Sequence, residues 1–136
     1  MPLERNYVIE KCGSAFFTPV TLRDNYKALT KKWNAAADFL AAYNGEHLGY
    51  VIFYANNIAT ATAYISMIAV HPLYQNKRIG NRLLLSAEEI AKERGMRRVE
   101  LEVRSDNEKA IAFYNRNGFT SKAQNGTQSN IMEKNL

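Results

Sequence analysis

The chain has 136 residues, a formal net charge of +5, 46% hydrophobic residues and 23% charged residues. This length suits one domain over residues 1–136 with a core of its own, and the composition excludes a disordered or fibrous chain. The positive charge favours anionic partners, but it does not distinguish nucleic acid from an acidic membrane or a phosphorylated cofactor.

The N-terminal part is predicted to form a strand and then a helix. Residues 7–12 read as the first strand. Thr18 and Pro19 have the character of an N-cap and a first helical residue, and the apolar residues that follow recur at spacings of four, three and four. This pattern predicts an amphipathic helix over residues 19–35.

The next segment is predicted to be an antiparallel meander. Strands are expected over residues 39–43 and 48–55, joined by an Asn-Gly pair at 44–45 that favours a tight turn through positive φ. A third strand over residues 60–70 is rich in β-branched and small apolar residues, and it ends at Pro72, which cannot continue a ladder.

A helix and a strand are predicted after the meander. The helix runs from about Ile79 to Arg94, with apolar residues on one face and Gly95 as its stop. A strand follows over residues 99–103. Ser105 and Glu108 have the spacing of a capping box, which predicts the start of another helix.

The last helix is expected to end at the Asn-Gly pair at 117–118, and residues 119–136 read as a hairpin interrupted at 125–126. The predicted order is β, α, three β, α, β, α, two β. It indicates an α/β (α+β) fold with a mixed, mostly antiparallel central sheet of about six to seven strands flanked by three to four helices.

Residues 70–84 combine a strand end, a basic loop and a helix start. The first turn of a helix has unpaired N–H groups and the positive end of the dipole, so it can bind a diphosphate. Gly80 would let a phosphate approach closely, and Lys77, Arg78 and Arg82 would add charge-assisted hydrogen bonds.

This segment resembles motif A of the GCN5-related N-acetyltransferases, which runs Gln or Arg, two residues, Gly, one residue, Gly or Ala. Gln75 and Gly80 match it, and Arg78 stands where the first glycine is usual. The resemblance implies acetyl-CoA as cofactor, bound in a splay between two central strands. The residues it assigns to the cofactor are Ile68, Ala69, Val70, Gln75, Asn76, Lys77, Arg78, Ile79, Gly80, Asn81, Arg82, Asn107 and Tyr114.

A second match lies in residues 101–107, 110–114 and 118–119, which resemble the next strand and helix of that family. By this resemblance Asn107 lies beside the pantetheine arm of the cofactor, and Tyr114 is the general acid that protonates the departing thiolate. The resemblance as a whole covers about residues 38–136.

The base is less sharply indicated, because residues 60–70 hold no carboxylate. Glu102 is the best candidate; it lies twelve residues before Tyr114, a spacing similar to that in the ribosomal-protein N-terminal alanine acetyltransferases. A water relay through Tyr64 or Ser66 would serve equally well. The structural alternatives are that Tyr114 is a core aromatic and that Glu102 is an exposed carboxylate paired with Arg97 or Arg104.

The function implied is transfer of an acetyl group from acetyl-CoA to a primary amine by direct attack in a ternary complex. The acceptor stays open between a protein N-terminus or lysine, an amino sugar, a polyamine and an aminoglycoside. Two other readings compete: a nucleic-acid-binding module that uses the basic residues, and an acyl-CoA-binding domain without catalysis.

Composition also bears on location and metals. The single cysteine, Cys12, and the absence of an apolar leader or an apolar run of ~20 residues predict a cytoplasmic protein with no membrane partner. With His47 and His71 as the only histidines, we expect no metal site. An unpaired terminal strand would offer an edge for a homodimer.

Overall fold

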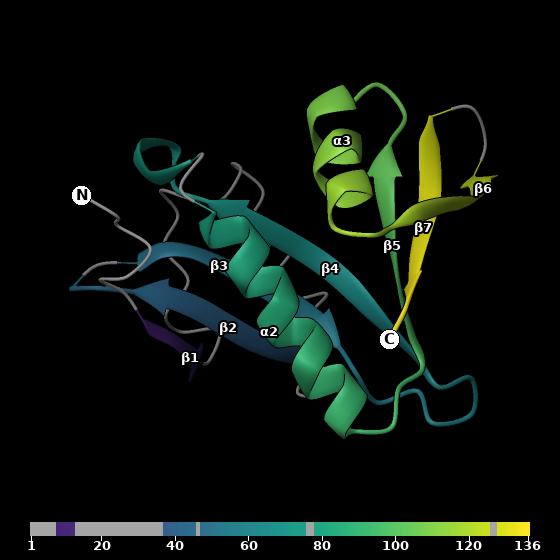
Figure 1. The fold of residues 1–136 in the computed structure, drawn as a ribbon, viewed down its shortest axis with the longest axis horizontal. Helices are drawn as coiled ribbons and strands as arrows, with labels where there is room; N and C mark the ends of the chain where they lie inside the picture. The colour runs from purple at the N-terminus through teal and green to yellow at the C-terminus, as the bar shows by residue number, and fades with distance from the viewer. Residues whose placement is uncertain (1–7, 13–36, 46, 76–77, 126–127) are drawn as a thin grey trace.

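The computed structural model describes residues 8–12, 37–45, 47–75, 78–125 and 128–136. The helix predicted over residues 19–35 and the loop residues Asn76 and Lys77 lie outside them. The described residues form a single seven-stranded sheet in the order β1-β2-β3-β4-β5-β7-β6 (Figure 1). The strands are β1 (Val8–Cys12), β2 (Ala37–Tyr43), β3 (His47–Tyr54), β4 (Thr62–Val70), β5 (Arg98–Arg104), β6 (Thr120–Asn125) and β7 (Ser129–Asn135).

Helices connect the strands in the second half of the chain. A single 3-10 turn, η4 (Pro72–Tyr74), follows β4 and leads to α2 (Ile79–Glu93); α3 (Glu108–Arg116) joins β5 to β6. β4 and β5 are parallel, whereas all other neighbouring strands of the sheet are antiparallel. The predicted mixed, mostly antiparallel sheet is therefore confirmed.

The predicted strands agree with the observed ones to within about two residues at each end. The meander of β2, β3 and β4 is confirmed by two antiparallel ladders. Gly45 and Gly95 both have positive φ, as the hairpin turn and the end of α2 require. Gly118, after α3, has a φ of 93° and ends that helix in the same way.

The capping box predicted from Ser105 and Glu108 is wrong. Asn107 is the N-cap of α3, and its Oδ1 accepts a hydrogen bond from the backbone N–H of Ala110 at 3.1 Å. Ser105 lies two residues before the cap, and its buried Oγ makes no hydrogen bond to any of the described residues. Asn caps a helix as well as Ser does, so the local pattern allowed two starts two residues apart.

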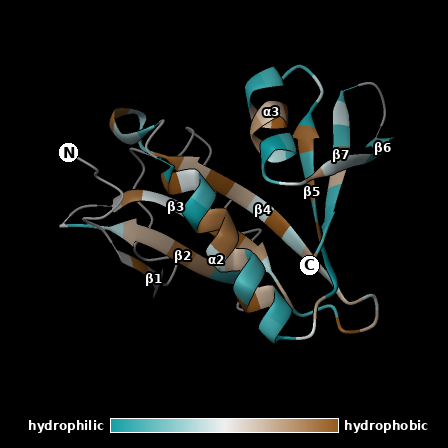
Figure 2. Ribbon diagram, viewed as in Figure 1, coloured by the Kyte–Doolittle hydropathy of each residue, from teal (hydrophilic) through white to brown (hydrophobic). Residues whose placement is uncertain are grey.

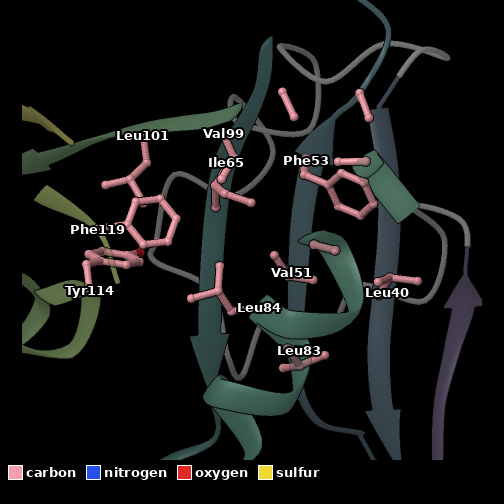
Figure 3. Packing of buried hydrophobic residues seen from close by; sticks show 14 of the residues in the cluster. Leu40, Val51, Phe53, Ile65, Leu83, Leu84, Val99, Leu101, Tyr114 and Phe119 are labelled. Atoms are coloured by element: carbon pink, nitrogen blue, oxygen red, sulfur yellow. The ribbon is translucent and has the colours of Figure 1, made fainter. Parts of the chain in front are cut away.

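The core is built on both faces of the sheet. The larger cluster joins the inner faces of α2 and α3 to one face of the sheet, where the rings of Tyr114 and Phe119 lie near Leu101 (Figure 3). A smaller cluster on the other face contains Phe39 and Ile52 with their neighbours. Hydrophobic and hydrophilic residues mix along α2 (Figure 2), as expected of a helix that buries one side.

A β-bulge interrupts β4. Ile52 pairs with Met67 and Phe53 pairs with Ile65, so the register between β3 and β4 shifts by one residue at Ser66. Because side chains alternate between faces, the extra residue exchanges the faces of the second half of the strand. Ile65 lies in the cluster on the α2 side, whereas Met67 packs on the other side.

Candidate functional site

β4 and β5 diverge in the middle of the sheet. Their parallel ladder joins Thr62–Ile65 to Arg98–Leu101 and then stops. Beyond it, β4 continues its ladder with β3 and β5 continues with β7, and the two strands separate into a V (Figure 1). Within the described residues, the two edges that line the V have no partner strand, so their peptide groups are available to a ligand. Ile68, Ala69 and Val70 lie on one of these edges.

The start of α2 lies just beyond the end of β4. Its N-cap, Arg78, has a left-handed backbone with φ 64°, and no side chain of the described residues caps the helix there. The first turn contains no acidic residue. Unpaired N–H groups and the helix dipole therefore favour an anion at this position.

The residues that are predicted to bind the cofactor at this helix start differ in solvent exposure. Arg78 and Arg82 are exposed, so their guanidinium groups can reach a bound anion. Ile79 is 1% exposed and its side chain belongs to the core. Ile79 can therefore contribute only its backbone N–H to a ligand.

One stripe of α3 bridges the V on the helical face. Successive turns of α3 contact the loop after β4 and the beginning of α2 in three places. These are Lys109 Nζ with Gln75 Oε1 (3.4 Å), Phe113 beside Gly80, and Asn117 Oδ1 with Asn81 Nδ2 (3.1 Å). The four-residue spacing of this stripe is visible in the sequence, but its partners are more than thirty residues away, and sequence reasoning missed Lys109, Phe113 and Asn117 as site residues.

Two of the predicted cofactor residues hold the V in shape. Gln75 Nε2 donates to the carbonyl of Val70 at 3.2 Å, which ties the loop to the end of β4. A Cβ on Gly80 would lie 3.4 Å from the ring of Phe113 and 3.6 Å from Val70. The missing side chain at Gly80 therefore lets α2 approach α3. From the sequence, Gly80 was predicted only to leave room for a phosphate.

Tyr114 is buried at the inner end of the V. It is 8% exposed, and its ring makes edge contacts with Phe113 and Phe119 at centroid distances of 5.2 and 5.6 Å. Burial, and then the nearby phenol of Tyr64, raise the pKa of Tyr114 to about 12. Tyr114 is thus both a core aromatic and a phenol that keeps its proton at neutral pH.

Glu102 and Tyr64 lie on the other face of the sheet. Glu102 alternates with the buried Leu101 and Val103 and is exposed, and it accepts a hydrogen bond from Ser129 Oγ at 2.6 Å. Arg104, one of its expected partners, pairs instead with Asp106 at 3.0 Å.

These two groups are electrostatically linked to Tyr114. Burial raises the pKa of Tyr64, and the negative charge of Glu102 raises it further. Tyr64 in turn acts on Tyr114. Glu102 therefore acts on Tyr64 and Tyr64 acts on Tyr114, which belongs to the cluster on the α2 side of the sheet.

Five cations of the described residues are paired with carboxylates. Arg94 makes a two-pronged contact with Asp38, at 2.5 and 3.0 Å. Lys122 and Lys134 pair with Glu100 and Glu88, each at 2.7 Å.

The described residues contain no group of three or more His, Cys, Asp or Glu side chains placed to hold a metal ion. Neither α2 nor α3 combines the length and apolar character that a bilayer span requires.

The family model of the acetyltransferase (GNAT) family matches residues 8–119 of this chain. Among curated proteins, a Bacillus subtilis protein named as a [ribosomal protein bS18]-alanine N-acetyltransferase is 34% identical over 114 residues, covering 83% of this chain and 72% of its own. The spermidine N(1)-acetyltransferase of Thermoplasma acidophilum is 34% identical over 96 residues, covering 71% and 58%.

A third curated relative, an uncharacterized N-acetyltransferase of Methanocaldococcus jannaschii, is 38% identical over 99 residues, covering 67% of this chain and 44% of its own. This chain therefore spans between 44% and 72% of the length of these three relatives.

Solved structures agree in fold. The paia N-acetyltransferase of Thermoplasma acidophilum, in complex with coenzyme A, has a TM-score of 0.67 and 29% identity, covering 82% of this chain and 68% of its own. The ribosomal-protein-S18-alanine N-acetyltransferase of Escherichia coli has a TM-score of 0.80 and 22% identity, covering 96% and 94%. At that identity the second likeness concerns the fold alone.

Proposed function

Because the chain belongs to the acetyltransferase (GNAT) family, we propose that it transfers the acetyl group of acetyl-CoA to a primary amine by direct attack in a ternary complex. One observation carries this proposal: the β4–β5 ladder stops at Ile65 and Leu101, and the resulting V opens toward an uncapped helix start. An extended ligand with amide groups and a diphosphate suits that pair of features.

The residues present fit the cofactor. Coenzyme A has a diphosphate, for which the N–H groups of the first turn of α2 and the side chains of Arg78 and Arg82 supply donors and charge. It also has an amide-containing arm, which the open edge of β4 at Ile68–Val70 would bind through backbone groups. A relative with 29% identity has been solved with coenzyme A.

The chemistry needs a neutral amine, donors for the charge that develops on the thioester oxygen, and a proton for the leaving sulfur. When bound, acetyl-CoA supplies the thioester carbonyl that the amine attacks. The C–N bond forms, the C–S bond breaks, and Tyr114 donates its proton to the sulfur. Glu102, directly or through Tyr64 and a water, removes the proton that the amine loses.

Backbone N–H groups on the open edge of β4, beyond its last pair with β5 at Ile65, are the proposed donors to the thioester oxygen. Fixed backbone dipoles of this kind stabilise developing charge without reorganising.

The relatives are named for different amines. One is named for an alanine of a ribosomal protein and another for spermidine. What they share is a primary amine as acceptor, so the proposed activity for this chain is stated at that level.

Two measurements on the purified chain test the proposal together. Calorimetric titration with coenzyme A should give a single site, and a panel of primary amines with acetyl-CoA should release free thiol for at least one acceptor. Coenzyme A binding without thiol release on any amine would favour an acyl-CoA-binding domain without catalysis. No binding at all would refute the cofactor site itself.

A matched pair of variants locates the binding site. Arg82→Gln should weaken coenzyme A binding by about threefold to tenfold, as expected for one exposed charge-assisted contact. Arg116→Gln, at the far end of α3 from its N-cap, removes the same charge and should leave binding unchanged. Equal effects of the two variants would indicate a general effect of net charge rather than a site at α2.

A further inference from the structure

A cavity of about 570 Å³ lies on the face of the sheet opposite α2 and α3. It is formed by the end of β3, the starts of β4 and β5, the first half of β6, and the loop between β3 and β4. Its lining includes Tyr54, Thr62, Tyr64, Arg98, Glu100 and Lys122. The volume is within the range of about 300–1,000 Å³ that small-molecule sites occupy.

The cavity adjoins the proposed reaction centre through Tyr64. Tyr64 pairs in register with Glu100, one row below the point at which β4 and β5 separate, and Glu102 lies one row above. The charge of Glu102 reaches the Tyr64 phenol, which in turn affects Tyr114. A molecule in the cavity would therefore have one end beside the groups proposed to move protons.

Among the described lining residues, two cations, Arg98 and Lys122, accompany one carboxylate, Glu100. Glu100 is paired with Lys122 at 2.7 Å and lies 3.9 Å from Arg98. Arg98 donates through Nε to Thr62 Oγ1 at 3.1 Å, and within the described residues its terminal nitrogens make no hydrogen bond. A guanidinium edge is thus left for an anion in the cavity.

The spacing along the strands separates these two features. Arg98 lies two residues before Glu100 and four before Glu102 on β5. Because a strand rises about 3.3 Å per residue, Arg98 lies about 7 Å along the strand from Glu100 and about 13 Å from Glu102. An acceptor with its amine at Tyr64 and an anionic group at Arg98 therefore needs several bonds between the two.

We infer that this cavity holds the acceptor, and that the acceptor is a small primary amine with an anionic group several bonds away from the nitrogen. The inference rests on the proposed acetyl transfer and names its substrate class. A carboxylate and a phosphate share the chemistry that Arg98 recognises, whereas a polyamine meets like charge in this cavity.

Matched acceptors test the inference. Thiol release from acetyl-CoA is measured with glycine, γ-aminobutyrate and 6-aminohexanoate against methylamine, propylamine and pentylamine, with glucosamine 6-phosphate against glucosamine, and with spermidine. We expect kcat/KM to favour the anionic member of a longer pair by about tenfold or more. The pair that responds distinguishes carboxylate from phosphate.

Two adjacent arginines provide the variant and its control. Arg98→Gln should reduce the anionic preference to within about twofold, chiefly by raising KM for the anionic acceptor. Arg97→Gln removes the same charge one residue away, outside the cavity lining, and should keep the preference. Urea unfolding of both variants establishes that they fold.

Binding gives a readout that does not need turnover. The N-acetylated form of the preferred acceptor should bind wild-type protein in calorimetry and bind Arg98→Gln at least about fivefold more weakly. Spermidine as the best acceptor, or an anionic preference that survives in Arg98→Gln, would overturn the inference. Coenzyme A binding with no thiol release on any acceptor would instead refute the proposed function.

Discussion

At the scale of single residues, Tyr114 carries two demands. It packs between Phe113 and Phe119 in the core, and it is the proposed proton donor. Tyr114→Phe keeps the ring and removes only the hydroxyl, so we expect kcat to fall by about 10²–10⁴ through loss of general-acid catalysis. Coenzyme A affinity, measured by calorimetry, should stay within about twofold because the proposed diphosphate site is elsewhere.

The control for this variant is Tyr43→Phe. Tyr43 is the last residue of β2, at the hairpin to β3 and away from the V. It should retain wild-type kcat. A Tyr114→Phe enzyme with undiminished kcat would remove Tyr114 from the mechanism and leave it as a core residue.

Arg78 combines strain with charge. Its φ of 64° lies in the left-handed region, which costs a non-glycine residue about 1–2 kcal/mol. Arg78→Gly relieves that cost but adds entropy to the unfolded chain, so we expect a net gain in the free energy of unfolding of about 0.5–1 kcal/mol. Urea unfolding measures the gain.

The same variant should bind coenzyme A about threefold to tenfold more weakly, because the guanidinium is lost. Arg78→Lys keeps both charge and backbone strain, and should resemble the wild type in stability and affinity. If Arg78→Gly binds coenzyme A as tightly as the wild type, the charge of Arg78 takes no part in binding coenzyme A.

At this scale, sequence reasoning located the motif residues but not their contacts. The match of Gln75 and Gly80 to a loop pattern identified the helix start correctly. It could not reveal that Gln75 bonds to Val70 or that Gly80 faces Phe113, because both contacts depend on how α2 and α3 pack. Asn107 was named as a ligand residue, and its observed role as the N-cap of α3 was missed.

At the scale of elements, the periodicity of the sequence predicted the strands and helices of the described residues to within a few residues. Irregularities were the exception. The bulge at Ser66 exchanges the faces of β4, and a segment made almost wholly of apolar residues gives no alternation that would reveal it. The partial β4–β5 ladder was expected only from the family resemblance, since register between distant strands leaves no local signal.

An ion pair fastens α2 to β7. Glu88 is 6% exposed and accepts a hydrogen bond from Lys134 Nζ at 2.7 Å, although the two residues are 46 positions apart. Glu88→Gln keeps an acceptor oxygen but removes the charge beside the ammonium group of Lys134, whose side chain is 29% exposed, so we expect the free energy of unfolding to fall by about 1–2 kcal/mol. Chemical denaturation with urea measures it.

A double variant distinguishes the effect of leaving one charge unpaired from the effect of removing both charges. Glu88→Leu with Lys134→Met replaces both charges by apolar groups and should lie within about 1 kcal/mol of the wild type, because neither charge is left unpaired. If Glu88→Gln alone proves as stable as the wild type, water already solvates the ammonium of Lys134.

At the scale of the whole molecule, the sheet has two working faces joined by the V. Both described helices and the proposed cofactor contacts lie toward one face, whereas Glu102, Tyr64 and the cavity lie on the other. A ligand on one face can meet a ligand on the other only because the ladder between β4 and β5 is partial. The proposed site therefore depends on sheet topology more than on any one motif. Sequence motifs gave candidate residues for the cofactor side of this proposed site, whereas the acceptor side has no motif of its own.

The raised pKa of Tyr114 makes the free energy of unfolding depend on pH. Its pKa is raised from 10.0 to about 12, so the folded protein keeps a proton that the unfolded chain releases above pH 10. Stability from this group is complete below pH 10 and falls as the pH rises toward 12, by up to on the order of 3 kcal/mol. Lysines and other tyrosines titrate in this range too, so urea midpoints are compared between wild type and Tyr114→Phe. The wild-type midpoint should fall more steeply with pH than that of the variant; parallel curves would mean that water reaches the phenol of Tyr114.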